Sequence, residues 1–365
     1  MIPLNNMMKN IVRKSTFIFL VSFLVVGLIP GNEKVFTDVV KADQMPTKAG
    51  QDANKPITIT FAGDVMLDKG VGAKINQYGV DYPFKYVTPY FKGSDLSVVN
   101  LETSVSTRGN AETKQFTFRS QPKTVQGIKN AGIDIVSLAN NHTLDYGPIA
   151  LFDTMNYLKK ANIGYTGAGK NIDDAFTAQY RTINGKKIAI LGISRVLPDP
   201  SWMASKTRAG IASGYTTNPM MSYVKNVVKK SDYTIVFIHW NKERMDYPEA
   251  YARSMGKQFI DAGVDAVIGA HSHSLMGTEL YKGKPIYYSL GNFVFEGNSS
   301  PKGKESMIVK LTLQNNKVSS SIIPLHIDNC QPRPVNNAYN QTIIKKLNKL
   351  SYNTKFTSTG SMISK

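Results

Sequence analysis

Residues able to bind a metal ion or move a proton follow five separate apolar runs of the sequence. The runs cover 57–61, 96–99, 133–138, 233–238 and 264–268, and their length and composition predict β-strands. Because sites in open α/β sheets form at the carboxyl ends of strands, we expect the polar residues that follow these runs to converge. They are Asp64, Asn100, Glu102, Asn140, Asn141, His142, His239, His271 and His273.

Imidazole, carboxylate and amide groups are the ligands expected for Zn, Mn or Fe. Four of the five histidines lie at these strand ends, and only His326 does not. His271 and His273 are two residues apart, so on a turn leaving a strand they can face two neighbouring ions. Two such ions, about 3.5–4 Å apart, can hold both the attacking and the leaving oxygen of a displacement. The pattern predicts a site for one or two divalent ions.

Each of these residues alone has a simpler explanation. A single Asp at a strand end is usually a cap or turn residue, and Asn140-Asn141 alone would be a turn. His239 alone would be a hydrogen-bonded core histidine. Only the ordered set of five strand ends favours a metal site.

Between the strands, four stretches predict helices that each begin near a proline, over 122–131, 148–160, 218–230 and 248–262. Strands alternating with helices predict an α/β fold with a parallel or mixed sheet and outer helices. Hairpin patterns at 180–190, 279–288 and 307–325 interrupt this order. They indicate a second sheet or an antiparallel edge.

Composition limits the class of protein. The chain has 365 residues, 42% of them hydrophobic, which suits one large domain with appendages. The net charge of +18 favours a polyanionic partner such as an acidic polymer or anionic lipid. We predict no nucleic-acid partner, because no zinc finger, aromatic RNA-binding signature or dense arginine cluster accompanies the charge. The single cysteine, Cys330, excludes an intramolecular disulfide and a cysteine-based metal site.

Residues 1–30 have the pattern of a segment that directs a protein to or across a membrane. Lys9, Arg13 and Lys14 precede an uncharged apolar run over 15–30, which indicates a signal peptide or a retained signal anchor at 1–30. We expect a polar tether at 31–55, a main domain at 56–335 and a basic polar tail at 336–365, with a short helix and then disorder. The charge order predicts a single-pass membrane protein whose main domain is extracellular, or a secreted one if cleavage occurs near Ala42.

The combined motifs are similar to a known family. Gly63-Asp64, Asn100-Leu101-Glu102, Asn140-Asn141-His142, His239-Trp240 and 269–273 resemble the CapA/PgsA poly-γ-glutamate capsule synthesis family, as do 289–293 and Gln331-Pro332. That family is similar to calcineurin-like metallophosphoesterases. The resemblance covers about 57–334. It implies a two-sheet α/β/β/α sandwich and a role in making or exporting poly-γ-glutamate.

The resemblance also implies roles for individual residues. His142 would protonate a leaving oxygen. Asn100, Asn140, Glu243 and Asn292 would be supporting residues, with Asn100 as the alternative to Glu102 for the bridging carboxylate position. The implied metal ligands are Asp64, Glu102, Asn141, His239, His271 and His273.

Two departures from the family pattern concern the first metal position and a turn. Met66 stands where many metallophosphoesterases have a histidine, which would weaken one metal position. Asn241 stands where the family commonly has glycine, and asparagine tolerates a positive φ better than most residues.

Three functions remain open from sequence. The first is a capsule-machinery subunit that handles an acidic polymer, poly-γ-glutamate, outside the membrane. The second is a metal-dependent hydrolase of a phosphoester or of a γ-glutamyl or cell-wall bond. The third is a structural or adhesive surface protein with a fossil site. The chain has no GxxxxGK[ST] loop, so we expect the ATP-dependent ligase to be one of its membrane-subunit partners.

Overall fold

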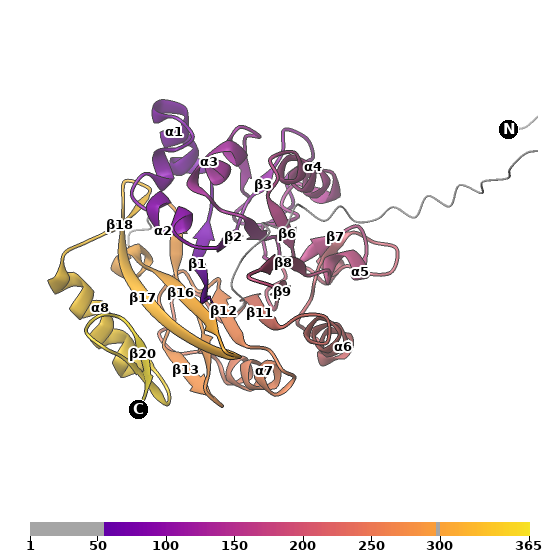
Figure 1. Ribbon diagram of the computed structural model, residues 1–365. Coiled ribbons are helices and arrows are strands. Elements are labelled where there is room, and N and C mark those ends of the chain that lie inside the picture. The colour runs from indigo at the N-terminus through magenta and orange to yellow at the C-terminus, as the bar shows by residue number, and fades with distance from the viewer. Residues whose placement is uncertain (1–54, 297–299) are drawn as a thin grey trace, which may run out of the picture. The chain divides into compact units, whose positions relative to one another are not determined.

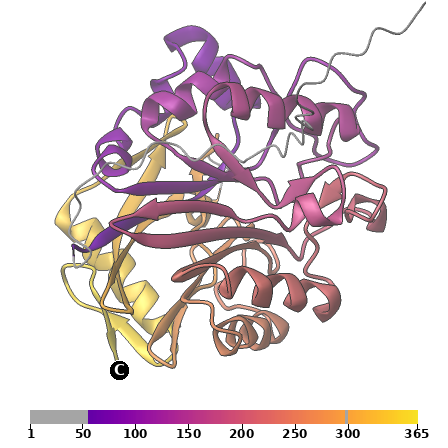
Figure 2. The ribbon, with the colours of Figure 1, turned by 45° about the vertical axis from the view of Figure 1, so that its right-hand side comes forward.

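Two β-sheets face each other and carry helices on their outer sides (Figures 1 and 2). The computed structural model describes residues 55–296 and 300–365. The expected signal segment at 1–30 and nearly all of the expected tether at 31–55 therefore lie outside the described residues. Among the helices that are described, none has the length and apolar character needed to span a bilayer.

The first sheet joins a parallel half to an antiparallel half. Its order is β18-β17-β16-β1-β2-β5-β6, and β15 also pairs with the end of β1. The parallel strands are β1 (Ile57–Val65), β2 (Leu96–Leu101), β5 (Ile135–Ser137), β6 (Gly164–Thr166) and β15 (Asn292–Val294). The antiparallel strands are β16 (Glu305–Gln314), β17 (Lys317–Asp328) and β18 (Gln331–Pro334).

The second sheet has parallel central strands and an antiparallel strand at each edge. Its order is β13-β14-β12-β11-β9-β8. The parallel strands are β9 (Lys186–Ser194), β11 (Tyr233–His239), β12 (Ala266–Ala270) and β14 (Lys284–Tyr287). The edge strands are β8 (Gln179–Ile183) and β13 (Thr278–Tyr281).

Helices cover the outer face of each sheet, and Figure 2 shows them above and below the stacked strands. Apolar residues of the first four helices pack on the first sheet: α1 (Lys69–Tyr78), α2 (Thr88–Lys92), α3 (Thr124–Ala131) and α4 (Gly147–Lys160). The second sheet is covered by α5 (Ile172–Ala175), α6 (Thr217–Val228) and α7 (Ala250–Asp261).

Short elements complete the connections: η1 (Tyr82–Phe84), β3 (Ser104–Val105), β4 (Arg119–Ser120), β7 (Ala168–Gly169), η2 (Pro200–Trp202), β10 (Gly210–Ile211) and η3 (Pro301–Lys304). After β18 come the 14-residue helix α8 (Asn337–Leu350) and the paired strands β19 (Thr354–Phe356) and β20 (Met362–Ser364).

Side-chain alternation along the strands builds the core between the sheets. Ile57, Ile59 and Phe61 of β1 share one buried cluster with Ile235 and Phe237 of β11. The rings of Phe61 and Phe237 meet edge to face, with centroids 6.0 Å apart and planes at 90°. Such a pair contributes about 0.5–1.5 kcal/mol beyond its buried area. Residues that continue this alternation at the carboxyl ends therefore also point between the sheets.

The α/β class expected from the sequence is confirmed. All five apolar runs form strands, and the four expected helices correspond to α3, α4, α6 and α7 with small shifts at their ends. The hairpin patterns contribute antiparallel strands to both sheets. Helix α1 was not predicted from the sequence, because only Val71 and Ile75 of this helix are buried and they make a weak apolar pattern.

The basic end of the chain is folded. The side chain of Asn336 caps α8 by accepting the backbone N–H of Tyr339 at 3.0 Å. Ile343 and Leu347, one helical turn apart, are buried in the core between the sheets, and Phe356 of β19 joins them. The expected short helix is therefore confirmed. The disorder expected after it was wrong, because a few apolar residues in this polar stretch reach the core.

Candidate metal centre

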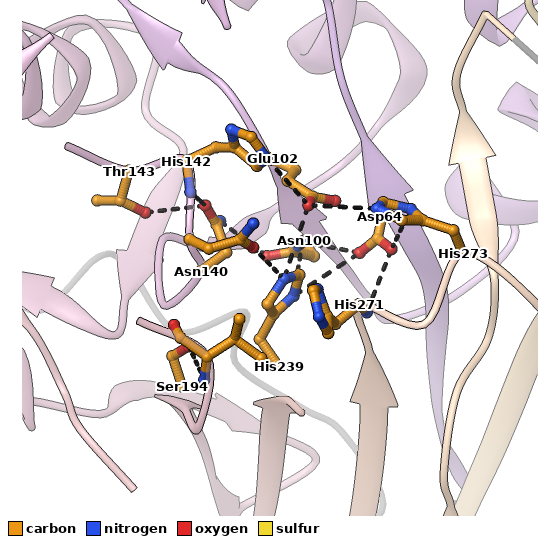
Figure 3. A network of polar contacts seen from close by, with 12 residues as sticks. Asp64, Asn100, Glu102, Asn140, His142, Thr143, Ser194, His239, His271 and His273 are labelled. Carbon is orange, nitrogen blue, oxygen red and sulfur yellow. Dashed lines mark hydrogen bonds and ion pairs between the residues drawn. The ribbon is translucent and has the colours of Figure 1, made fainter. Parts of the chain in front are cut away.

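Strand geometry brings the predicted side chains to one place. In β2, Leu96 and Val98 face the core between the sheets, and the same alternation continues with Asn100 and Glu102. In β11 the alternation ends on His239. Figure 3 shows the resulting cluster, in which two carboxylates lie among four imidazole rings: Asp64, Glu102, His142, His239, His271 and His273.

Asp64 is held where the end of β1 meets β2 and β15. Its backbone N–H donates to the carbonyl of Gly291 at 3.3 Å. A Cβ on Gly63 would lie 1.9 Å from the same carbonyl oxygen, so this position requires glycine. The carboxylate accepts hydrogen bonds from Asn100 Nδ2 at 2.8 Å and from the backbone N–H of His271 at 3.2 Å. Burial raises the pKa of Asp64 despite these bonds.

Glu102 is the least satisfied side chain of the cluster. It is fully buried, and neither carboxylate oxygen has a hydrogen-bond partner among the residues described. Its Oε1 lies 3.6 Å from His239 Nε2, 3.9 Å from His142 Nε2 and 4.0 Å from His273 Nε2. Burial, followed by the nearby charge of Asp64, raises its pKa well above the ordinary value. A buried carboxylate without a partner is costly, so this arrangement fits a cation bound beside Glu102.

The histidines from the second sheet surround this carboxylate. The ring centroids of His239 and His271 are 4.6 Å apart, and those of His271 and His273 are 5.9 Å apart. Both residues after β12 have left-handed backbone, with φ of 94° at His271 and 52° at His273, which turns their rings toward the first sheet. Burial lowers the pKa of His239 and His271 well below the ordinary value, so both are neutral at pH 7. Neutral imidazole is the form that binds metal ions.

The residues present fit a divalent cation. One ligand atom each from Glu102, His271 and His273 lie within 4.8 Å of one another. His271 Nδ1, like both Glu102 oxygens, is buried without a hydrogen-bond partner in the described structure. Carboxylate oxygen with imidazole nitrogen is a donor set that suits Zn, Mn or Fe.

Amide side chains orient several members of the cluster. Asn140 Nδ2 donates to Asn100 Oδ1 at 3.0 Å, and Asn100 Nδ2 donates to the carboxylate of Asp64. Asn141 Oδ1 lies 2.8 Å from His239 Nε2. Both ends of the Asn100 amide are therefore engaged. Of the two alternatives for the bridging position, only Glu102 offers unpaired oxygens.

Of the two remaining residues expected to support the site, Asn292 contacts a histidine of the cluster and Glu243 does not. Asn292 Oδ1 lies 2.7 Å from His273 Nδ1, and its amide donates to the carbonyl of Gly303 at 2.9 Å. Glu243 is exposed, and it makes no hydrogen bond or ion pair within 55–296 or 300–365. The structure therefore does not bring Glu243 into contact with a histidine of the cluster.

His142 and Asp145 form a buried dyad with Lys114 and Phe118 beside it, and none of these neighbours was predicted from the sequence. Asp145 Oδ2 lies 2.7 Å from His142 Nδ1, and Lys114 Nζ donates to Asp145 Oδ1 at 2.6 Å. The ring of Phe118 packs against the imidazole at a tilt of 34°, with centroids 4.3 Å apart. Burial lowers the pKa of His142, and the bond to Asp145 raises it in part. The spacing of His142 and Asp145 by three residues was a local signal for this pair, whereas Lys114 comes from a distant loop.

The sequence of this chain is similar to those of known bacterial proteins. The pattern of the family described as bacterial capsule synthesis protein PGA_cap matches residues 58–297, most of the chain. The chain belongs to this family. It is 33% identical over 324 residues to the capsule biosynthesis protein CapA of Bacillus anthracis, covering 86% of this chain and 76% of that protein. It is 32% identical to the PGA biosynthesis protein CapA of Bacillus subtilis, covering 80% of this chain and 78% of that one.

Among solved structures, this PGA_cap protein is similar to a 5'-nucleotidase from Candida albicans, with a TM-score of 0.40 and 12% identity. The match covers 73% of this chain and 51% of the nucleotidase. A similarity of this size supports no inference about fold or activity.

The two departures from the family pattern have structural counterparts. Asn241 has φ of 72°, so the turn after β11 requires the left-handed backbone for which glycine is suited. Its side chain compensates locally, because Oδ1 accepts the backbone N–H of Glu249 at 2.9 Å. Met66 is fully buried in the core under the outer helices of the first sheet. This PGA_cap protein therefore has an apolar residue at the position where a further histidine ligand was considered.

Proposed function

We propose that this chain is a component of poly-γ-glutamate capsule synthesis or export that acts outside the cell membrane and holds a divalent metal ion. The names of the two bacterial relatives, which refer to capsule and PGA biosynthesis, support the pathway. The net charge of +18 suits a polycarboxylate partner. The basic and then apolar start of the chain supports a membrane anchor with the main domain outside. An ATP-dependent ligase would then be a separate membrane subunit.

The metal part of the proposal rests on the unpaired oxygens of buried Glu102, which face three histidines. The resemblance of the motifs to calcineurin-like metallophosphoesterases supports the same interpretation. Bound there, a Mn, Zn or Fe ion would polarise a scissile group and activate water. The residues that would hold it are Asp64, Glu102, Asn141, His239, His271 and His273.

His142 is the residue suited to move a proton beside this cluster. In the neutral ring, the contact with Asp145 places the hydrogen on Nδ1 and leaves the lone pair of Nε2 directed toward Glu102. His142 therefore has to take up a proton at Nε2 before it can protonate a leaving oxygen. The carboxylate of Asp145 then stabilises the imidazolium, and Phe118 keeps water from one face of the ring.

Gene deletion with complementation tests the first proposal. Loss of the gene should lower the amount of capsular poly-γ-glutamate, and the full-length chain should restore it. Asp64→Ala and His271→Ala should fail to restore capsule and should lose the metal, measured on full-length protein purified in detergent. His326→Ala is the matched control, since this histidine lies away from the cluster, and it should restore both.

An unchanged capsule after deletion would remove the pathway from the proposal. Capsule restored by metal-free variants would remove the role of the metal.

A metal-dependent hydrolase is the second candidate, and the buried His142–Asp145 dyad favours it. The substrate would contain a phosphoester or a γ-glutamyl or cell-wall bond. His142→Ala should lower turnover by about 10²–10⁴-fold, the usual contribution of a general acid or base, while the metal content stays the same. Metal-loaded protein that cleaves neither a phosphodiester nor a γ-glutamyl substrate would eliminate this candidate and leave the first.

A further inference from the structure

Arg195, the first residue after β9, stacks on aromatic rings without an anionic partner. Its Cζ lies 3.7 Å from the ring centroid of Tyr215 and 5.0 Å from that of Tyr251. The guanidinium makes no hydrogen bond or ion pair with any residue that the structure describes, and the side chain is half-buried. Stacking on a ring face leaves the N–H edge free. A free planar edge matches the two oxygens of a carboxylate or a phosphate.

The backbone of Arg195 is fixed beside a strand end of the candidate metal centre. Ser194 pairs in register with His239, and the backbone N–H of Arg195 donates to the carbonyl of His239 at 2.8 Å. The hydroxyl of Tyr251 accepts the backbone N–H of Asn241 at 2.8 Å, two residues beyond His239. Both the arginine and one of its rings are therefore fastened to the strand end that carries a candidate ligand.

A second arginine is placed in the same way on the other histidine segment. The backbone N–H of Arg244 donates at 2.7 Å to the carbonyl of Ser272, between His271 and His273. Its side chain is exposed and also has no partner in the described part of the chain. Every other described arginine donates to a carboxylate, an amide or a carbonyl. The two arginines without a partner are thus the two bonded to ligand-bearing segments.

We propose that Arg195, together with Arg244, binds an oxyanion of the substrate at the rim of the metal centre. This inference rests on the proposed function, which supplies a chain with one free carboxylate per γ-linked glutamate. In such a polymer an anion lies near every backbone bond, so a fixed arginine beside the metal centre sets which bond reaches it. The phosphate of a phosphoester offers the same oxyanion chemistry and is the other source to be tested.

Equilibrium binding to the full-length, metal-loaded protein tests the proposal, with poly-γ-glutamate oligomers in one arm and a phosphodiester in the other. Arg195→Ala should weaken binding about tenfold or more, the effect of losing a charge-assisted bidentate contact. Arg195→Lys should recover only part of this loss, because an ammonium keeps the charge but not the planar edge. Metal content and melting temperature should stay at the wild-type values.

Arg333→Ala is the matched control. Arg333 also lies beside a tyrosine ring, at 5.6 Å from the Tyr86 centroid, but it is paired with Asp328 on β17 in the other sheet. This variant removes one positive charge away from the centre, so binding should change little.

Each outcome has a distinct meaning. A loss in the polymer arm identifies the oxyanion as a carboxylate, and a loss in the phosphodiester arm alone identifies it as a phosphate. Equal losses in Arg195→Ala and Arg333→Ala, or a loss that follows a fall in metal content, would overturn the inference. Wild-type binding that Arg195→Ala leaves unchanged would overturn it as well, while the proposed function would stand. A wild-type protein that binds neither ligand would overturn the proposed function and this inference with it.

Discussion

Two glutamates, Glu102 and Glu279, are equally buried but have opposite surroundings. Glu279 is 0% exposed and accepts two bonds from Arg253, at 2.9 and 3.0 Å, and one from the hydroxyl of Tyr288 at 2.7 Å. Lys257 Nζ lies 3.1 Å away. Glu102 is also 0% exposed but has no hydrogen-bond partner in the described residues.

The pKa of each carboxyl reflects this difference. Burial acts to raise the pKa of Glu279, but the bonds from Arg253, Tyr288 and Lys257 outweigh it and the pKa is lowered. For Glu102, burial and the charge of Asp64 act in the same direction and the pKa is raised. The fold can thus satisfy a buried carboxylate with its own side chains, and at Glu102 it does not. This contrast between the two glutamates is the physical basis for placing a cation beside Glu102.

The largest expected effect concerns the satisfied carboxylate. Glu279→Ala should lower the free energy of unfolding by about 3–5 kcal/mol, because it removes two charge-assisted bonds from Arg253 and leaves the buried hydroxyl of Tyr288 without its acceptor. The measurement is denaturant unfolding, with exposed Glu249→Ala as the control. Metal content should not change. A loss below about 1 kcal/mol would show that the Glu279 cluster is not a stabilising unit.

Metal removal should lower the free energy of unfolding only when Glu102 is present. Stripping the ion from wild type should lower the free energy of unfolding by about 2.7 kcal/mol relative to protein at a metal concentration 100 times the dissociation constant. The same treatment should leave Glu102→Ala unchanged, since that variant would hold no ion. Thermal unfolding with and without chelator measures both. A chelator effect of equal size in the two proteins would contradict the assignment.

Replacing the Glu102 carboxylate with a neutral amide should raise the stability of the metal-free protein, although the carboxylate is needed to bind the metal. The folded pKa of Glu102 is above its ordinary value of 4.5, so folded protein binds the proton more tightly than unfolded protein. The free energy of unfolding of metal-free protein therefore falls as pH rises from 4.5 through the folded pKa. Glu102→Gln cannot titrate, and it should be about 1–3 kcal/mol more stable than metal-free wild type at pH 7.

Unfolding curves of both metal-free proteins at several pH values measure this difference. A variant less stable than wild type throughout would mean that Glu102 is satisfied by its protein surroundings.

The smallest expected effect is the contribution of His271 to the pH dependence of the free energy of unfolding. The pKa of His271 is lowered by burial below its ordinary value of 6.5, so only the unfolded chain binds a proton just below that pH. Stability of metal-free protein is then lost as pH falls below 6.5, at about 1.4 kcal/mol per pH unit for one proton. His271→Gln should flatten this part of the pH profile. His326→Gln, at a more exposed histidine, should flatten it less.

Much of the cluster was predictable because its chemistry follows strand ends. A period of two along β2 and β11 carries apolar residues into the core and then delivers Asn100, Glu102 and His239 to its edge. Asp64 and the histidines after β12 do not follow this period, since the register of β1 shifts between Phe61 and Asp64, but their place at the strand ends still finds them. Parallel strands share one carboxyl edge, so no long-range information was needed for these residues.

The rest depended on loops and on distant contacts. Lys114 reaches the Asp145 carboxylate from a loop 31 residues earlier, and no periodic pattern links the two. Glu243 follows the strand end in sequence, but its side chain is exposed and makes no hydrogen bond to a histidine of the cluster in the described residues. Arg195 was not singled out because its rings, Tyr215 and Tyr251, come from separate segments. Membrane attachment and extracellular location stay predictions.

The C-terminal packing affects how the chain can be shortened. The family match ends at residue 297, whereas β16 lies between β1 and β17 in the first sheet. Removing every residue after 297 would leave one edge of β1 without its hydrogen-bonded partner strand, β16. It would also expose the apolar residues that Leu347 and Phe356 cover. Such a fragment would present an open strand edge and should precipitate. The segment that matches the family pattern is therefore expected not to fold alone, and a shortened chain has to keep β16 and β17.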